Sequence, residues 1–128
     1  MKKLTLIVTL LFSTVIFSSS SYSGWKLGGV SENGESIIYE NYESVKKVGK
    51  YVYWWSMVDY LEPYRGLHSM KMYHKGDCRL FRIKTLSFIY HKKPMGRDKG
   101  ITDNRPDPKW RYPEQGSGSA NFLKEQCR

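Results

Sequence analysis

The sequence predicts an α+β fold, in which an antiparallel β-sheet carries one C-terminal α-helix tethered to it by a disulfide. Short runs rich in β-branched and aromatic residues alternate with Gly-, Pro- and Asn-containing turns over most of the chain. One helical pattern follows a run of serines and glycines near the C-terminus. Cys78 and Cys127 fall in these two parts, one in each. A single helix on such a sheet is an α+β architecture.

The first residues predict a secretory signal peptide over residues 1–23, followed by one domain over residues 24–128. A basic start at Lys2 and Lys3 precedes an apolar run, Leu4–Phe17, and small residues surround Ser23-Gly24. The run is shorter than the ~20 apolar residues that a membrane-spanning helix needs. No second apolar segment follows, so we expect no membrane span, and no cysteine follows the run to carry a lipid. We expect the protein to be exported to the periplasm, the cell surface or the medium.

The cysteines then predict one disulfide, because an even number of cysteines in an oxidising compartment is typically paired. A Cys78–Cys127 bond would close a loop for which the chain-entropy relation gives ~4 kcal/mol of stabilisation. Two free thiols and an intermolecular pair are the alternatives.

Composition favours an anionic partner. Without Lys2 and Lys3, 19 Lys and Arg face 12 Asp and Glu, a formal charge of +7, and aromatic residues make up 15% of the chain. Acidic protein patches, polyanionic glycans and lipid head groups suit such a surface. The alternative is that the charge only keeps the domain soluble. We expect no nucleic-acid partner, since no binding motif for one is present.

The first half of the domain reads as strands. Trp25–Val30 and Ser36–Tyr42 flank a hairpin signal at Asn33-Gly34. Glu43–Lys50 reads as a polar turn region, and Tyr51–Tyr60 is the clearest strand of the chain.

The second half adds two strands, His68–Tyr73 and Leu80–His91, and then a basic loop, Lys92–Lys99. On Leu80–His91, simple alternation places Phe88 on one face and Ile83 on the other. Prolines predict an extended or irregular stretch from Asn104 to Pro113. Ser117–Cys127 is the predicted helix, capped by Ser117 or Ser119.

Two features are binding-site candidates. Lys92, Lys93, Arg97 and Lys99 cluster on the basic loop, which is either a partner-binding site or a solvated turn. Trp54 and Trp55 are adjacent and point to opposite faces of a strand. We expect both to be core residues, with exposure of one for binding as the alternative.

A search for catalytic and metal-binding patterns favours a protein that is not an enzyme and has no cofactor. His68, His74 and His91 are the only histidines, and their spacing gives no metal site or catalytic group. We expect them to lie on the surface or in turns.

The order of several motifs resembles the surface-adhesin protein E family of Gram-negative bacteria, over essentially the whole exported part of the chain. The residues that carry the resemblance are Trp25, Tyr39, the Gly49–Tyr60 strand with Trp55, Asp77-Cys78, Arg82, Leu86-Ser87, Pro94-Met95-Gly96 with Gly100, Trp110, Pro113, Gly116-Ser117 and Cys127. The chain departs from the named adhesin in lacking a lipid-attachment cysteine after the apolar run.

The resemblance implies an antiparallel sheet with its C-terminal helix bonded through Cys78 and Cys127. It also implies adhesion to host matrix or serum proteins such as vitronectin, laminin or plasminogen, in some members as a homodimer. The expected function is therefore that of an exported, non-catalytic binding domain for host or envelope proteins. The alternative is a periplasmic inhibitor or accessory protein that docks on an enzyme or an envelope component.

Overall fold

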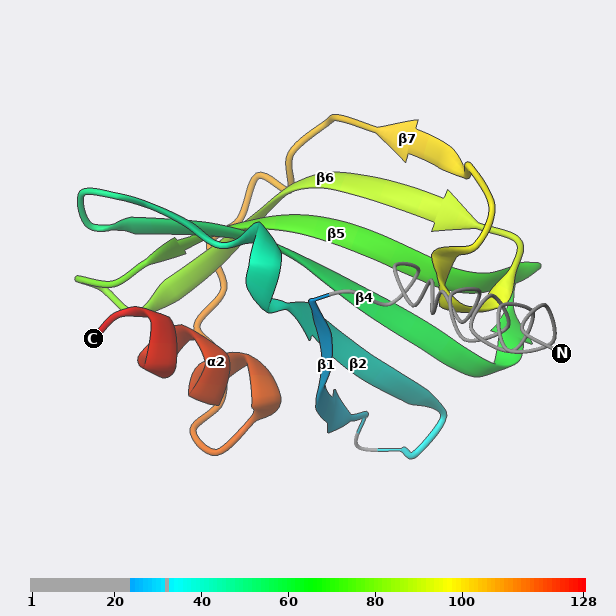
Figure 1. Ribbon diagram of the computed structural model, residues 1–128, viewed down its shortest axis with the longest axis horizontal. Helices are drawn as coiled ribbons and strands as arrows, with labels where there is room; N and C mark the ends of the chain where they lie inside the picture. The colour runs from blue at the N-terminus through cyan, green and yellow to red at the C-terminus, as the bar shows by residue number, and fades with distance from the viewer. Residues whose placement is uncertain (1–23, 32) are drawn as a thin grey trace, which may run out of the picture.

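The computed structural model describes residues 24–31 and 33–128, and the predicted signal peptide lies outside them. The described residues form a seven-stranded antiparallel sheet with the order β1-β2-β4-β5-β6-β7, and β3 pairs with β4 beside this path (Figure 1). The strands are β1 (Trp25–Val30), β2 (Ser36–Asn41), β3 (Lys46–Val48), β4 (Tyr51–Tyr64), β5 (Leu67–Asp77), β6 (Arg82–His91) and β7 (Ile101–Asp103). The described residues also form the helix α2 (Gly118–Gln126) and two 3₁₀ turns, η2 (Tyr42–Ser44) and η3 (Pro94–Gly96). Within the described part, no helix is long and apolar enough to cross a membrane.

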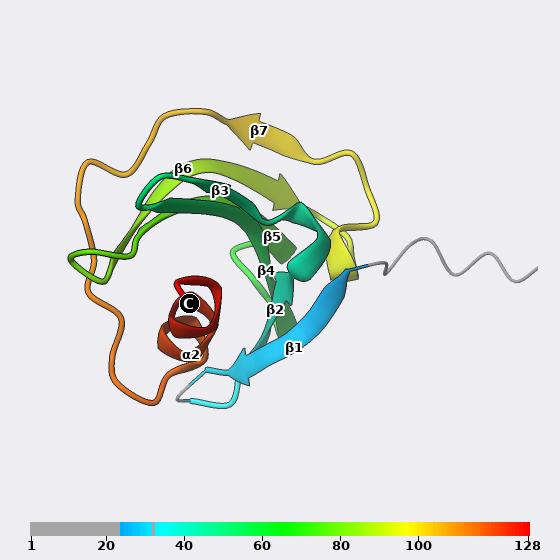
Figure 2. The same cartoon turned by 60° about the vertical axis from the view of Figure 1, so that its left-hand side comes forward.

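The sheet curves around α2, which lies against its concave face (Figure 2). Val52 and Trp54 of β4 point to this face and pack against Phe122 and Leu123 of the helix. All four side chains are at most 2% exposed, so the main apolar core lies between helix and sheet. The predicted α+β fold is confirmed.

The predicted disulfide is also present. Cys78, which directly follows β5, is bonded to Cys127, the residue that ends α2, and their Cα atoms are 5.4 Å apart. The bond tethers the end of the helix to the sheet at the border of the core, where both cysteines pack against the buried cluster.

The helix begins as the sequence predicts. Ser117 is its N-cap, and the hydroxyl of Ser117 accepts a hydrogen bond from the backbone N–H of Ala120. Gly76 of β5 lets the helix approach closely, because a Cβ atom there would lie 2.5 Å from Leu123 Cδ1 and 2.9 Å from the Trp54 ring.

Pairing with neighbouring strands overrides two predictions. The expected polar turn over residues 43–50 contains β3, because Lys46–Val48 forms a ladder with Tyr51–Tyr53. The expected end of a strand at Tyr73 is wrong as well. β5 continues to Asp77, since its backbone pairs with β4 on one side and β6 on the other.

A β-bulge in β6 changes which side chains share a face. Tyr73 pairs with Ser87, but the next residue, His74, pairs with Thr85. The extra residue on β6 places Ile83 and Phe88 on the same concave face, whereas simple alternation predicts opposite faces.

The segment after β6 wraps the edge of the sheet. The short strand β7, which the sequence analysis missed, pairs with Phe88–Tyr90 of β6. The proline-containing stretch beyond it is largely irregular, as expected, and it returns to β6 through a bridge between Arg111 and Ile83. This path brings the chain around to the concave side, where α2 begins (Figure 2).

Candidate binding surface

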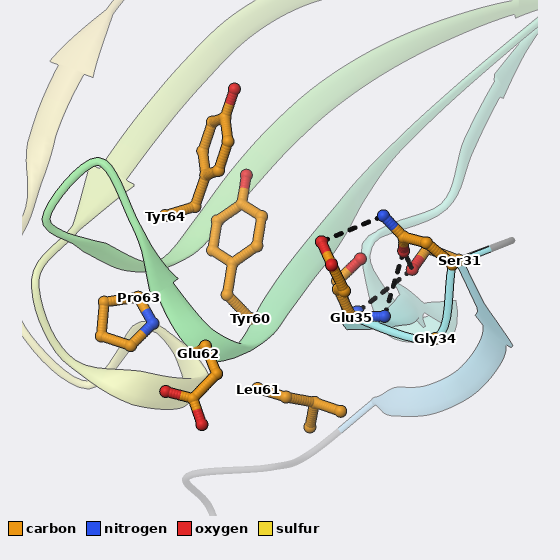
Figure 3. Close-up of a pocket in the computed structure, with 10 residues that line it drawn as sticks. Ser31, Gly34, Glu35, Tyr60, Leu61, Glu62, Pro63 and Tyr64 are labelled. Carbon is orange, nitrogen blue, oxygen red and sulfur yellow. Dashed lines mark hydrogen bonds between the residues drawn. The ribbon is translucent and has the colours of Figure 1, made fainter.

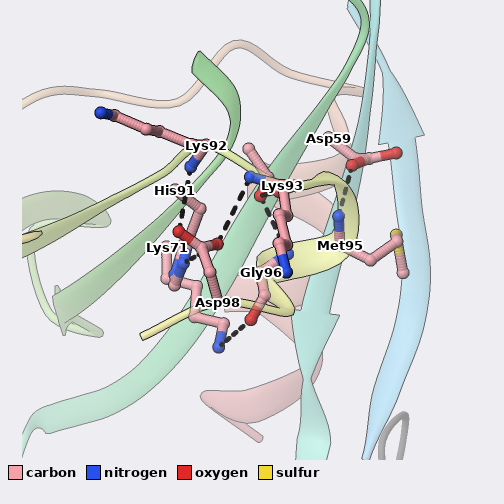
Figure 4. Close-up of polar contacts among 9 residues, drawn as sticks. Asp59, Lys71, His91, Lys92, Lys93, Met95, Gly96 and Asp98 are labelled. Carbon is pink, nitrogen blue, oxygen red and sulfur yellow. Dashed lines mark hydrogen bonds and ion pairs between the residues drawn. The ribbon is translucent and has the colours of Figure 1, made fainter. Parts of the chain in front are cut away.

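The basic loop, Lys92–Lys99, is held in one conformation by Asp98. The Asp98 carboxylate accepts hydrogen bonds from the backbone N–H groups of Lys92 (3.1 Å) and Lys93 (3.4 Å). It also pairs with Nδ1 of the buried His91 at 3.0 Å. Burial raises the pKa of Asp98, but these hydrogen bonds outweigh it and hold the pKa below its usual range. Figure 4 shows the Lys92 side chain extending away from this cluster.

A second set of hydrogen bonds fixes the loop to β4 and β5. The Asp59 carboxylate accepts from the Met95 backbone N–H at 2.8 Å. The hydroxyl of Ser69, which is fully buried, donates to the Lys93 carbonyl at 2.7 Å and accepts from the Gly96 N–H at 2.8 Å. The loop is therefore a rigid part of the convex face, opposite α2.

The side chains that the sequence analysis selected remain at the surface. Lys92, Lys93, Arg97 and Lys99 are all exposed. The loop covers Met57, which is 1% exposed, so its backbone closes a small apolar region while its cations face outward. Whether these four residues bind a partner stays a prediction.

Next to the loop, aromatic side chains line the same convex face. Tyr51, Tyr53 and Trp55 alternate along β4, and Tyr73 is their neighbour on β5. The ring of Tyr73 is 5.0 Å from that of Trp55 and 6.2 Å from that of Tyr53. We call these four residues the aromatic row. Only Trp54 of the tryptophan pair is in the core, so the expectation that both are core residues is wrong for Trp55, which is partly exposed.

Lysines flank the aromatic row. The Lys75 ammonium lies 4.1 Å from the centre of the Tyr51 ring, and the Lys50 ammonium lies 5.1 Å from it. Further along β5, Lys71 bonds to the Gly96 carbonyl of the basic loop at 3.3 Å. The loop and the aromatic row are thus continuous, and we call them together the basic–aromatic face. From the sequence, the loop cations and the tryptophan pair are separate candidates. The period of two in Tyr51, Tyr53 and Trp55 is the sequence signal that these three rings share a face, whereas the position of the loop beside them depends on strand register.

The histidines differ from the sequence expectation. His91 is buried beneath the basic loop. His74 lies on the concave face, where its two ring nitrogens are hydrogen-bonded to Ser56 Oγ (2.6 Å) and Thr85 Oγ1 (3.0 Å). The expectation of surface or turn positions is therefore wrong for both residues. Among the described residues no cluster of three or more potential metal ligands is present.

A hollow of about 650 Å³ lies between the β1–β2 turn and the end of β4 (Figure 3). Tyr60 and Tyr64 form one side of it, with ring centres 5.6 Å apart. The opposite side is a turn whose polar groups bond to one another, since Asn33 accepts from Ser31 and donates to Glu35. Residue 32 of this turn is outside the described part, and we assign no ligand to the hollow.

The surface-adhesin protein E family matches residues 25–128. The chain belongs to this family. The match spans the whole sheet, the basic loop and α2, and it agrees with the resemblance drawn from the motifs.

Solved structures of protein E from Haemophilus influenzae share the fold. One is 17% identical in sequence, with a TM-score of 0.56 over 82% of this chain and 84% of that chain. A selenomethionine form is 15% identical, with a TM-score of 0.57 over 82% and 86% of the two chains. Protein E from a non-typeable strain is 16% identical, with a TM-score of 0.53 over 88% and 78%. No curated protein matches the chain.

Family membership makes this chain a surface-adhesin-type binding protein of exported character. At this identity the solved structures support the fold alone.

Proposed function

We propose that the protein is a non-catalytic adhesin that binds an acidic protein surface through its basic–aromatic face. One observation carries the proposal. The exposed cations of the basic loop and the partly exposed Tyr and Trp rings of the aromatic row lie on one continuous face, opposite the helix.

Each part of this face suits a step of binding. Exposed cations speed the encounter with an acidic partner. Tyr and Trp supply the apolar contact area that dominates the energy of most interfaces. The loop is held by Asp98, Asp59 and Ser69, so little of its conformational freedom is lost on binding.

Family membership supports a protein partner. We propose host matrix or serum proteins as targets, with immobilised vitronectin, laminin and plasminogen as the probes. Homodimer formation is a separate proposal, which sedimentation of the purified protein tests.

Two variants test the two halves of the face by surface plasmon resonance. Lys92→Glu with Lys93→Glu should slow association about tenfold at low salt and weaken its salt dependence. Trp55→Ala should leave association nearly unchanged and raise the dissociation rate by about tenfold, the usual effect of losing a central aromatic contact. The charge variant should leave the melting temperature nearly unchanged, because solvated charges contribute little to stability. Trp55→Ala should lower it, because the ring loses its cross-strand contact with Tyr73, so binding by this variant is measured well below its melting temperature.

The matched control is Lys109→Glu with Lys124→Glu, which makes the same charge change at exposed sites that are not part of the basic–aromatic face. If this control slows association as much as the loop variant does, net charge and not the basic–aromatic face governs binding. If none of the three probes binds and the protein instead fractionates with a periplasmic enzyme or envelope protein, the accessory-protein alternative replaces the adhesin.

A further inference from the structure

The concave face carries a cavity that the basic–aromatic face does not involve. It measures about 400 Å³ and lies between β4, β5 and β6, the segment over residues 107–113 and the start of α2. This volume falls in the range of small-molecule sites. Its apolar wall is formed by Trp54, Met72, Ile83, Phe88 and Pro113.

Two carboxylates line the cavity, Glu40 of β2 and Asp107, and of the two only Asp107 has a charged partner among the described residues, Arg111. Glu40 is 2% exposed, and its Oε2 accepts a hydrogen bond from Trp54 Nε1 at 2.8 Å. No described residue donates a hydrogen bond to the second oxygen, Oε1. Burial raises the pKa of Glu40 to about 7, against the opposing effect of the Trp54 hydrogen bond. A donor at Oε1 would favour the ionised form.

The other charged groups of the cavity compensate one another. Arg111 lines the cavity together with Asp107, whose Oδ2 accepts from Arg111 Nε at 3.0 Å and lies 3.0 Å from Nη2. Burial lowers the pKa of His74 to about 4, so its ring is neutral at pH 7. The cavity therefore has no uncompensated positive charge to match Glu40.

The residues that neighbour Glu40 outside the cavity do not supply a positive charge to it either. Lys26 is the register partner of Glu40 on β1, but the Lys26 ammonium lies over the Tyr42 ring, 4.8 Å from its centre. The Tyr42 hydroxyl donates to Glu125 of α2 at 3.2 Å.

We propose that this cavity binds a small organic amine, whose ammonium group donates to Glu40 Oε1 while its apolar body packs against Trp54 and Phe88. A cation suits the site in two ways. It pairs with the buried carboxylate, and it lies close to aromatic rings whose faces attract positive charge. The volume accommodates one aromatic ring with a short aliphatic chain.

Titration calorimetry of the oxidised, exported protein tests this with 2-phenylethylamine and its neutral counterpart, 2-phenylethanol. We expect saturable binding of the amine, at least tenfold tighter than that of the alcohol at pH 8. Between pH 6 and pH 8 the affinity for the amine should rise up to about tenfold, because Glu40 ionises over this interval while the ammonium stays protonated. The indole N–H signal of Trp54 in NMR spectra should shift with saturation. Equal affinity for amine and alcohol, or no saturable binding of either, overturns the proposal.

Glu40→Gln assigns the effect to one residue, since the amide oxygen can still accept from Trp54. It should remove both the preference for the amine and the pH dependence. Glu114→Gln, at an exposed position, is the matched control and should bind as the unaltered protein does. Unchanged amine binding by Glu40→Gln contradicts the proposal. If that variant fails to fold, the proposal is tested by the difference in affinity between the amine and the alcohol for the unaltered protein.

Discussion

Glu40 and His74 both contact Trp54 on the concave face, and burial shifts their pKa values in opposite directions. The Glu40 carboxylate bonds to the indole N–H, and the His74 ring lies 5.2 Å from the indole ring. The pKa of Glu40 is raised from 4.5 to about 7, and that of His74 is lowered from 6.5 to about 4. As pH rises, the shift of Glu40 therefore lowers the free energy of unfolding, and the shift of His74 raises it.

The stability that Glu40 contributes is fully present below pH 4.5 and is lost as pH rises through 7, a change of about 3 kcal/mol. The contribution of His74 is present above pH 6.5 and is lost as pH falls through 4. We expect the two to offset each other between pH 4.5 and pH 6.5 in the unaltered protein. In Glu40→Gln, the free energy of unfolding should rise with pH over this range, and at pH 8 the variant should be the more stable protein. Urea unfolding of both proteins at four pH values measures the pH dependence and the difference at pH 8. The same pH dependence of the free energy of unfolding in the two proteins would contradict the pKa shift of Glu40.

At the scale of elements, the contact of α2 with the sheet depends on a glycine, Gly76, which has no side chain. A Cβ atom at Gly76 would overlap Leu123 and Trp54, both of which are buried in the core. Gly76→Ala should therefore displace the helix and lower the free energy of unfolding by about 1–3 kcal/mol, the usual effect of overpacking. Gly29→Ala is the matched control, because a Cβ there meets its nearest atom at 3.9 Å. Equal changes in the free energy of unfolding for the two variants in urea would contradict this, because they would show that contact with the helix is not responsible.

The disulfide holds the C-terminal end of the same helix, about one turn beyond Leu123. The double variant Cys78→Ser with Cys127→Ser leaves no free thiol and should lose about 2–5 kcal/mol of stability. Hydrogen exchange should show the largest loss of protection in α2, since the bond is the covalent link between helix and sheet. A uniform loss over all strands would mean that the bond acts only on the unfolded chain.

At the scale of the whole molecule, the sequence predicts export with removal of residues 1–23. N-terminal sequencing of the exported protein should give Gly24 as the first residue, with no attached lipid. A retained Met1 or an acylated product would contradict this prediction. Attachment to the cell surface would then rest on protein contacts, for which we propose the basic–aromatic face.

Local sequence signals determined much of this fold. The alternation of residues 51–60 specified a strand, Asn33-Gly34 specified the first hairpin, and Ser117 specified the start of the helix. These predictions held because each depends on residues a few positions apart, through strand period, turn chemistry and capping. The cysteine pairing held because the domain contains only two cysteines.

Only the tertiary structure decided what those elements bring together. Strand pairing turned Lys46–Val48 into β3 and extended β5 to Asp77, because backbone partners on neighbouring strands outweigh the local preference for a turn. The bulge in β6 reversed the side-chain alternation and placed Phe88 on the same face as Ile83. The basic–aromatic face and the Glu40 cavity both join residues from several strands. Their existence depends on register and sheet curvature, which arise from contacts between residues far apart in the sequence.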